Sequence, residues 1–284
     1  MALSYNDIDK SQKELGDILR PYQIPGGDND DKSVTLSEVA NQAKEYGLTP
    51  YLRPNGTIEK LKQFIANDIP VVTRTWLKAN EDIGHYRVIR GYDDARSIII
   101  QDDSLQGSDL SYSYSDFERL WLPFNYEYLV LVSDDKKELV EHILGDEVSE
   151  NKAWENALKR LSLERDSAPS NWHLTFALSR IHYYLKDYKS SIAEFEKVEN
   201  TISFRTLWYQ IEPILSLYED GQYDRVFALT DKVLSNQNMA YSELYIIRGD
   251  IFKKRGEINR SNAEYEKALK YNMNSKDAKK RLSL

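Results

Sequence analysis

One histidine and two aspartates stand at positions where their side chains could meet. The sequence GHYRVIRGYDD at residues 84–94 runs into SIIIQDDS at 97–104, and two strand patterns joined by so short a loop predict an antiparallel hairpin. A three-residue loop makes paired residue numbers sum to 188 and places His85 opposite Asp103, whereas a two-residue loop places Asp102 there. Facing side chains on antiparallel strands lie about 5 Å apart, within reach of an imidazole–carboxylate contact.

Such a contact has a defined chemical use. A carboxylate beside one ring nitrogen of a histidine fixes the tautomer and raises the basicity of the other nitrogen, which suits a general base next to a nucleophile. The hairpin could therefore supply two members of a catalytic triad. The same residues also fit an ordinary strand with polar ends, and the spacing alone does not separate the two interpretations.

The elements around this hairpin predict an α+β fold. Thr35 and Glu38 have the capping-box spacing and predict a helix over 36–46 that Gly47 ends. A second helix is predicted over 58–66. Strands are predicted over 71–76, 85–91, 98–101 and 126–132. The short loops between the middle strands imply antiparallel pairing, so the helices should pack on one face or end of an antiparallel sheet.

Three blocks of this region, at 84–94, 100–107 and 114–121, resemble in order and spacing the bacterial peptidase-like domains of cysteine peptidase family thirty-nine, within the papain-like superfamily. The resemblance implies a papain-like α+β domain in which His85 is the catalytic base and Asp103 orients it. Ser104 stands where proline is commoner, and the adjacent Asp102 keeps an alternative orienter open. The resemblance also makes Lys32 and Ser33, which follow the loop at 26–31, candidates for binding substrate.

The nucleophile that the resemblance implies is absent from the sequence. The family has Cys-Gly-Pro-Ala at the start of a helix, with an oxyanion-hole glutamine shortly before it, whereas the 284 residues contain no cysteine. Residues 1–5 resemble the continuation of that helix, so we expect the chain to begin inside it. The intact parent is then expected to be a cysteine peptidase and this chain to be inactive. The alternative is a noncatalytic scaffold that binds peptides or proteins through a degenerate peptidase fold and helical repeats.

The second half of the sequence shows an internal period of 35 residues. Lys186, Gly221 and Gly256 occupy equivalent turns, each followed by apolar residues at helical spacing. Residues 172–272 resemble tetratricopeptide repeats, except that Pro213 should kink or break one helix. Helices near 154–161 and 277–284 are expected to cap the stack. The predicted domains are a cysteine-peptidase-like domain at 1–133, a connecting helix or linker at 134–150, and tetratricopeptide-like all-α repeats at 151–284.

Composition excludes several other classes of protein. With 38 Lys and Arg against 46 Asp and Glu, the net charge of −8 argues against a nucleic-acid partner, and no apolar run is long enough to span a membrane. The absence of cysteine excludes disulfides and thiolate metal sites. The acidic stretch at 26–31 lacks the spacing of an EF-hand, so neither a metal nor a cofactor is expected. The expected partner is a peptide or protein. The sequence carries no secretory signal, which indicates the cytoplasm unless an export signal lies upstream.

Overall fold

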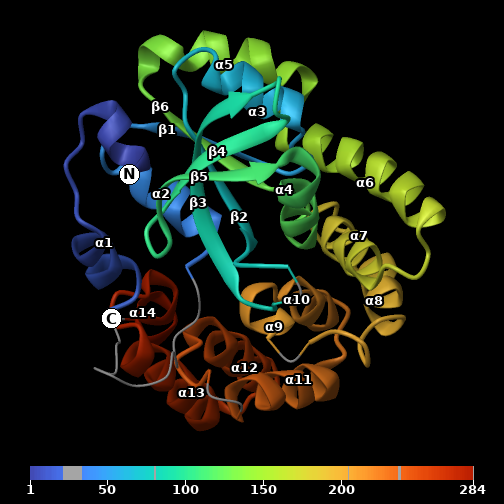
Figure 1. Ribbon diagram of the computed structural model, residues 1–284. Helices are drawn as coiled ribbons and strands as arrows, with labels where there is room; N and C mark the ends of the chain where they lie inside the picture. The colour runs from blue at the N-terminus through green and yellow to red at the C-terminus, as the bar shows by residue number, and fades with distance from the viewer. Residues whose placement is uncertain (22–33, 80, 204, 236–237, 284) are drawn as a thin grey trace. The chain divides into compact units, whose positions relative to one another are not determined.

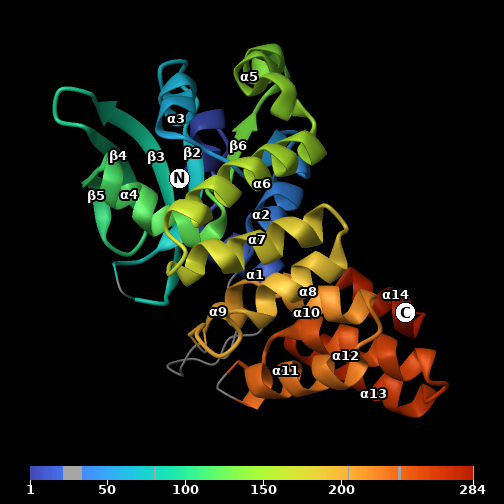
Figure 2. The same cartoon turned by 90° about the vertical axis from the view of Figure 1, so that its right-hand side faces the viewer.

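The structure is a computed structural model that describes residues 1–21, 34–79, 81–203, 205–235 and 238–283. It contains two compact units (Figures 1 and 2). Unit 1 comprises residues 1–10 and 35–202, and unit 2 comprises residues 11–34 and 203–284. The chain therefore contributes an early segment and a late segment to unit 2.

Unit 1 combines a sheet with helices. Its strands are β1 (Thr49–Arg53), β2 (Val71–Trp76), β3 (Gly84–Asp93), β4 (Ile98–Asp103), β5 (Gly107–Ser113) and β6 (Tyr128–Val132). Its α-helices are α2 (Leu36–Lys44), α3 (Ile58–Ile65), α4 (Tyr114–Trp121), α5 (Lys137–Leu144), α6 (Glu150–Ser167), α7 (Trp172–Tyr184) and α8 (Tyr188–Glu196). Short 3-10 helices are η1 (Ala2–Asn6), η2 (Leu122–Phe124), η3 (Asp134–Lys136) and η4 (Gly145–Val148).

The six strands form one antiparallel sheet in the order β1-β6-β2-β3-β4-β5. Every residue of the apolar strand β6 is buried, as its central place in the sheet requires. Both edge strands, β1 and β5, were not expected from the sequence. Helix α3 packs against β2 and β3, and α4 packs against β2, β4 and β5.

The two helices predicted for the first half are confirmed with small changes of length. Thr35 and Glu38 form the expected capping box at the start of α2, and Thr57 caps α3 through the backbone N–H of Lys60. Gly47 follows α2 with a positive φ of 78°. The fold class is as expected: an α+β part with an antiparallel sheet, followed by a part in which every described regular element beyond residue 133 is helical.

Two arginines, one half-buried and one buried, tie the loops of the sheet to α6 and α7. Arg160 of α6 donates to the carbonyl oxygen of Gly56 at 2.9 Å and covers the ring of Tyr126. The Arg180 guanidinium of α7 is 4 % exposed and contacts Asn125 at 2.6 Å and Glu127 at 2.7 Å. Helices α6 and α7 run side by side (Figure 2). These contacts explain why the helices up to residue 202 belong to the same unit as the sheet.

Unit 2 consists of helices: α1 (Gln12–Leu19), α9 (Thr206–Tyr209), α10 (Glu212–Glu219), α11 (Tyr223–Ser235), α12 (Ser242–Lys254), α13 (Ile258–Tyr271) and α14 (Lys276–Leu282). The expected interruption at Pro213 is present, because α9 ends at Tyr209 and Pro213 lies in the first turn of α10. Helix α14 occupies the stretch expected to cap the stack.

The 35-residue period corresponds to three helix-to-helix turns. Lys186 joins α7 to α8 with φ 62°, Gly221 joins α10 to α11 with φ 80°, and Gly256 joins α12 to α13 with φ 78°. Glycine suits such left-handed positions, whereas lysine adopts them at a cost. The periodic helix pairs fit a repeat protein; the tetratricopeptide resemblance and the domain limits given above remain predictions.

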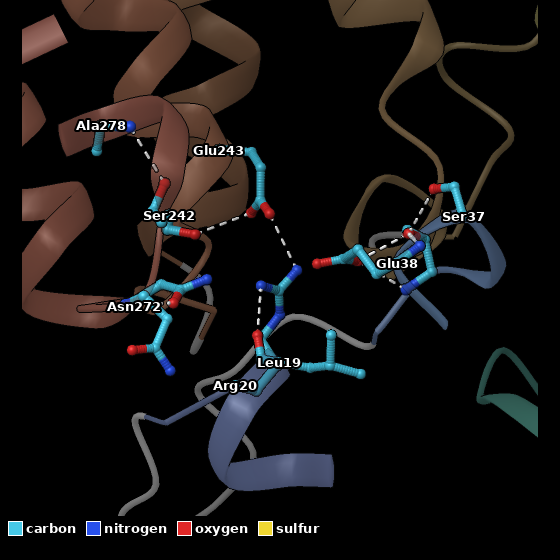
Figure 3. A network of polar contacts seen from close by, with 11 residues as sticks. Leu19, Arg20, Ser37, Glu38, Ser242, Glu243, Asn272 and Ala278 are labelled. Carbon is cyan, nitrogen blue, oxygen red and sulfur yellow. Dashed lines mark hydrogen bonds and ion pairs between the residues drawn. The ribbon is translucent and has the colours of Figure 1, made fainter. Parts of the chain in front are cut away.

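Helix α1 is held to the later helices of unit 2 at its C-terminal end (Figure 3). The Arg20 side chain is 6 % exposed and places Nη2 2.9 Å from Glu243 Oε1 on α12. The side-chain amide of Asn274 donates to the carbonyl oxygens of Asp17 and Ile18, which the helix leaves without intrahelical partners. A buried ion pair and a C-terminal cap therefore fix one end of this eight-residue helix.

Candidate functional site

The β3–β4 hairpin differs from its expected register. Asp93 pairs with Ile98, so four residues form the loop, and paired numbers sum to 191 near it. A β-bulge between Ile89 and Gly91 then changes the sum to 190. The expected sum of 188 was wrong because the loop is longer and lies farther along the chain, and the bulge, which inserts one residue into β3, reduces the difference from three to two. Continued along the strands, the observed register sets Arg87, not His85, across from Asp103.

His85 and Asp103 nevertheless meet. In this register His85 lies two residues from Arg87 on the same face of β3, diagonal to Asp103. Its Nε2 is 2.8 Å from Asp103 Oδ1, and the two side chains are 16 % and 0 % exposed. Asp102 points to the opposite face, where its Oδ2 lies 2.9 Å from Arg90 Nε. Of the two aspartates left open by the sequence, Asp103 is the one beside the imidazole.

The turn after β4 holds the Asp103 carboxylate. Oδ1 accepts the backbone N–H groups of Leu105 at 2.7 Å and Gln106 at 2.9 Å. Burial of Asp103 works against its charge, but the N–H of Gln106, the His85 ring and the N–H of Leu105 outweigh that effect and hold the pKa of Asp103 below its usual value. Asp103 is therefore an anion at neutral pH.

This lowered pKa predicts a dependence of stability on pH. Because Asp103 holds its proton less tightly in the folded chain, its charge stabilises the fold above the unfolded pKa of about 3.9, and this contribution is lost as the pH falls through the folded pKa. We expect the difference in unfolding free energy between the wild type and Asp103→Asn to be constant from pH 7 to 5 and to shrink below pH 4. Urea titrations at pH 7, 5, 4 and 3 measure it; a difference that grows toward low pH contradicts it.

Arg87 completes this buried cluster, and the sequence analysis missed it. The residue is 1 % exposed, and its Nε lies 3.4 Å from Asp103 Oδ2. This approach is an ion pair, whereas the guanidinium donates hydrogen bonds to Thr75 Oγ1, to the carbonyl oxygens of Trp76 at 3.0 Å and Leu77 at 2.7 Å, and to Gln106 Oε1 at 3.1 Å. Its position two residues after His85 in a strand was the available signal, because alternate residues share a face.

The arrangement determines which ring nitrogen can do chemistry. An ionised carboxylate only accepts hydrogen bonds, so Nε2, which faces Asp103, is the nitrogen that carries the proton in the neutral ring. Nδ1 is then left with its lone pair. The geometry thus provides an imidazole that is oriented by a buried anion and that, in its neutral form, has one nitrogen free to accept a proton.

The other expected site residues lie elsewhere. Lys32 and Ser33, the candidates for binding substrate, fall outside the described residues. Over the described ranges, no three histidine or carboxylate side chains gather in a way that could hold a metal ion. A cavity of about 400 Å³ is lined by residues that include Asn6, Tyr46 and Lys136, and does not include His85 or Asp103. Within the same ranges, no helix combines the length and the apolar character needed to cross a bilayer.

Comparisons with known proteins concern the first half of the chain. Residues 1–129 match the sequence model of the Peptidase_C39 like family. A crystal structure of a C39-like peptidase from Bacillus anthracis is similar to 46 % of this chain and 84 % of its own, with 19 % sequence identity and a TM-score of 0.36. A search of the curated proteins found no match. The stretch that contains His85 and Asp103 is therefore peptidase-like in sequence.

Proposed function

We propose that His85 and Asp103 are the base and the orienting carboxylate of a thiol-dependent peptide hydrolase. The observation that carries the proposal is the 2.8 Å approach of Nε2 to a buried, ionised Asp103, which leaves Nδ1 as the basic nitrogen. The family match over residues 1–129 supports the reaction class. The nucleophile would be a cysteine thiol, which the 284 residues do not contain.

The reaction follows from these roles. Nδ1 of His85 takes the proton of the thiol, and the thiolate attacks the peptide carbonyl carbon, forming a C–S bond. The imidazolium then gives its proton to the leaving nitrogen as the C–N bond breaks. Water attacks the resulting thioester while Nδ1 accepts a proton from it, and the thiol is released. Asp103 stabilises the imidazolium in both halves of this cycle and keeps Nδ1 directed at the reacting atoms.

The chain can be tested without its own cysteine by supplying a small thiol in solution. With 2-sulfanylethanol as nucleophile and 4-nitrophenyl acetate as acyl donor, we expect His85→Ala to slow the thiol-dependent release of 4-nitrophenolate about 10²-fold, the lower end of the effect of a positioned base. The matched control is His142→Ala, because His142 is an exposed histidine on α5. Equal rates for the wild type and His85→Ala would refute the proposed base.

The rival function is a noncatalytic scaffold that binds peptides or proteins, and the absence of cysteine from all 284 residues favours it. The DNA upstream of the codon for Met1 separates the two. An in-frame segment encoding Cys-Gly-Pro-Ala supports the hydrolase, and the longer chain can then be assayed for peptide cleavage. A start codon at Met1 with its own ribosome-binding site supports the scaffold.

A further inference from the structure

The roles assigned to His85 and Asp103 do not explain why Arg87 beside them is buried. A guanidinium that is 1 % exposed is costly unless its donors are satisfied. The guanidinium lies over the ring of Tyr112 on β5 at 5.4 Å, and its polar contacts fall into two further groups. One consists of the end of β2: the Thr75 hydroxyl and the carbonyl oxygens of Trp76 and Leu77. The other consists of the β4–β5 turn: Asp103 Oδ2 and Gln106 Oε1. Arg87 therefore bridges two segments that surround the His85–Asp103 contact.

The two oxygens of Asp103 have different partners. Oδ1 faces His85 Nε2 and the backbone N–H groups of Leu105 and Gln106, whereas Oδ2 faces Arg87 Nε. An arginine fixed at several points on its other side restrains the rotation of this carboxylate about its Cβ–Cγ bond. The planar fork of the guanidinium suits this task, because its donors point in fixed directions, whereas the ammonium of lysine is a single point on a flexible stem.

We propose that Arg87 is a positioning residue: it anchors the Asp103 carboxylate and the turn after β4 to the end of β2, so that Oδ1 stays directed at Nε2 of His85. This inference rests on the proposed function and deepens it: Asp103 orients His85, and Arg87 in turn orients Asp103. Arg87 touches neither the imidazole nor the position of a substrate in this scheme. Its effect on the chemistry passes through Asp103.

The test follows the proton on His85 Nε2 by ¹⁵N–¹H NMR of the ring in the full chain. Because the contact with Asp103 retains this proton, we expect Arg87→Met to accelerate its exchange with water at least about tenfold. Arg87→Lys is expected to behave in the same way, since it keeps the charge and loses the fork. The matched control is Arg90→Met, which removes an arginine–aspartate pair from the opposite face of β3 and is expected to stay within about twofold of the wild type.

A coupled variant separates positioning from general loosening of the fold. Asp103→Asn should strongly accelerate the exchange of the ring proton in the wild type. In the Arg87→Met background, where Arg87 no longer restrains the Asp103 carboxylate, the same substitution should change the exchange by less than about twofold. Equal acceleration in both backgrounds, or wild-type exchange in Arg87→Lys, would overturn the proposal. If neither Arg87 variant folds, Gln106→Ala decides: this exposed residue links Arg87 to the turn, and faster exchange supports the proposal, whereas unchanged exchange refutes it.

The two proposals can fail separately. A ring proton that responds to Arg87 in a chain without His85-dependent thiol chemistry would leave the positioning role standing and refute the hydrolase. If the rate depends on His85 but the exchange of the ring proton does not change in the Arg87 variants, the hydrolase proposal stands and the positioning role of Arg87 is refuted.

Discussion

Asp103→Asn is expected to reduce the thiol-dependent rate about 10²-fold, to the level of His85→Ala. The reason lies in the donors around the carboxylate. If the new amide nitrogen takes the place of Oδ1, it confronts the N–H groups of Leu105 and Gln106 and turns a donor toward His85, which forces the ring proton onto Nδ1. If it takes the place of Oδ2, it confronts the Nε–H of Arg87. The 4-nitrophenolate assay detects the changed ring proton when the amide nitrogen replaces Oδ1. Urea unfolding detects the loss of stability when it replaces Oδ2.

The matched control for this change is Asp102→Asn. Asp102 precedes Asp103 directly, and it contacts Arg90 and the backbone N–H of Asp109 on the other face of the hairpin. This control variant should keep the wild-type rate within about twofold, because its substitution leaves the contacts of His85 unchanged. If Asp102→Asn loses the activity and Asp103→Asn retains it, the assignment of the orienting carboxylate is wrong.

Gly56→Ala is expected to lower the free energy of unfolding by about 3 kcal/mol, the upper part of the range for an added group in a close-packed core. A Cβ at this position would lie 2.2 Å and 2.5 Å from ring carbons of Trp121 and 2.9 Å from the carbonyl oxygen of Tyr126. Trp121 is fully buried, and Arg160 holds the Gly56 carbonyl from another side, so neither neighbour can give way easily. Urea unfolding monitored by tryptophan fluorescence measures the loss.

Gly91→Ala provides the comparison for this prediction. Its Cβ would meet the Ile100 side chain at 3.2 Å, a contact that a small shift relieves. We expect it to cost less than about 1 kcal/mol, so that the difference between the two alanine variants isolates the clash with Trp121. Similar losses for both would indicate that glycine matters at these sites for another reason.

Much of the fold could be predicted from local signals. The capping box of Thr35 and Glu38, the strand beginning at Val71 and the apolar strand that ends at Val132 are determined by nearby residue types, and all three were found. The capping box of Ser11 and Glu14, which starts α1, carried the same signal and was overlooked.

The two edge strands were missed for physical reasons. β1 contains Pro50, which lacks an N–H and normally argues against a strand, but a proline is tolerated on an edge because one side of the strand has no partner. β5 reads GSDLSYS, a composition typical of a loop, and its residues are largely exposed on the other edge. Pairing with the preceding strand β4 forms this strand, from Asp103 with Gly107 to Ile98 with Ser113, and the residue types of β5 alone do not indicate it.

The site was predicted in its residues and not in its geometry. His85 and Asp103 were chosen from their types and approximate spacing. The register, however, also depended on a β-bulge. Its one sign in the sequence was Gly91, because an isolated glycine within a strand pattern often marks a bulge. The longer loop took His85 out of the facing position, and the bulge then set Arg87 opposite Asp103 with His85 diagonal to it. A buried arginine of this kind can be recognised only when its partners, which come from the end of β2, from β4 and from the turn after β4, are assembled.

The attachment of α1 within unit 2 has a consequence for biosynthesis. Arg20 and its partner Glu243 are separated by 223 residues, which a ribosome adds in about 10–45 s at roughly 5–20 residues per second. An eight-residue helix is marginal by itself in water, so α1 lacks the stabilising contact with Glu243 until those residues have been synthesised. The strands of the sheet all precede α12 in the chain and can pair during that interval, whereas unit 2 can bring α1 and α12 together only after it.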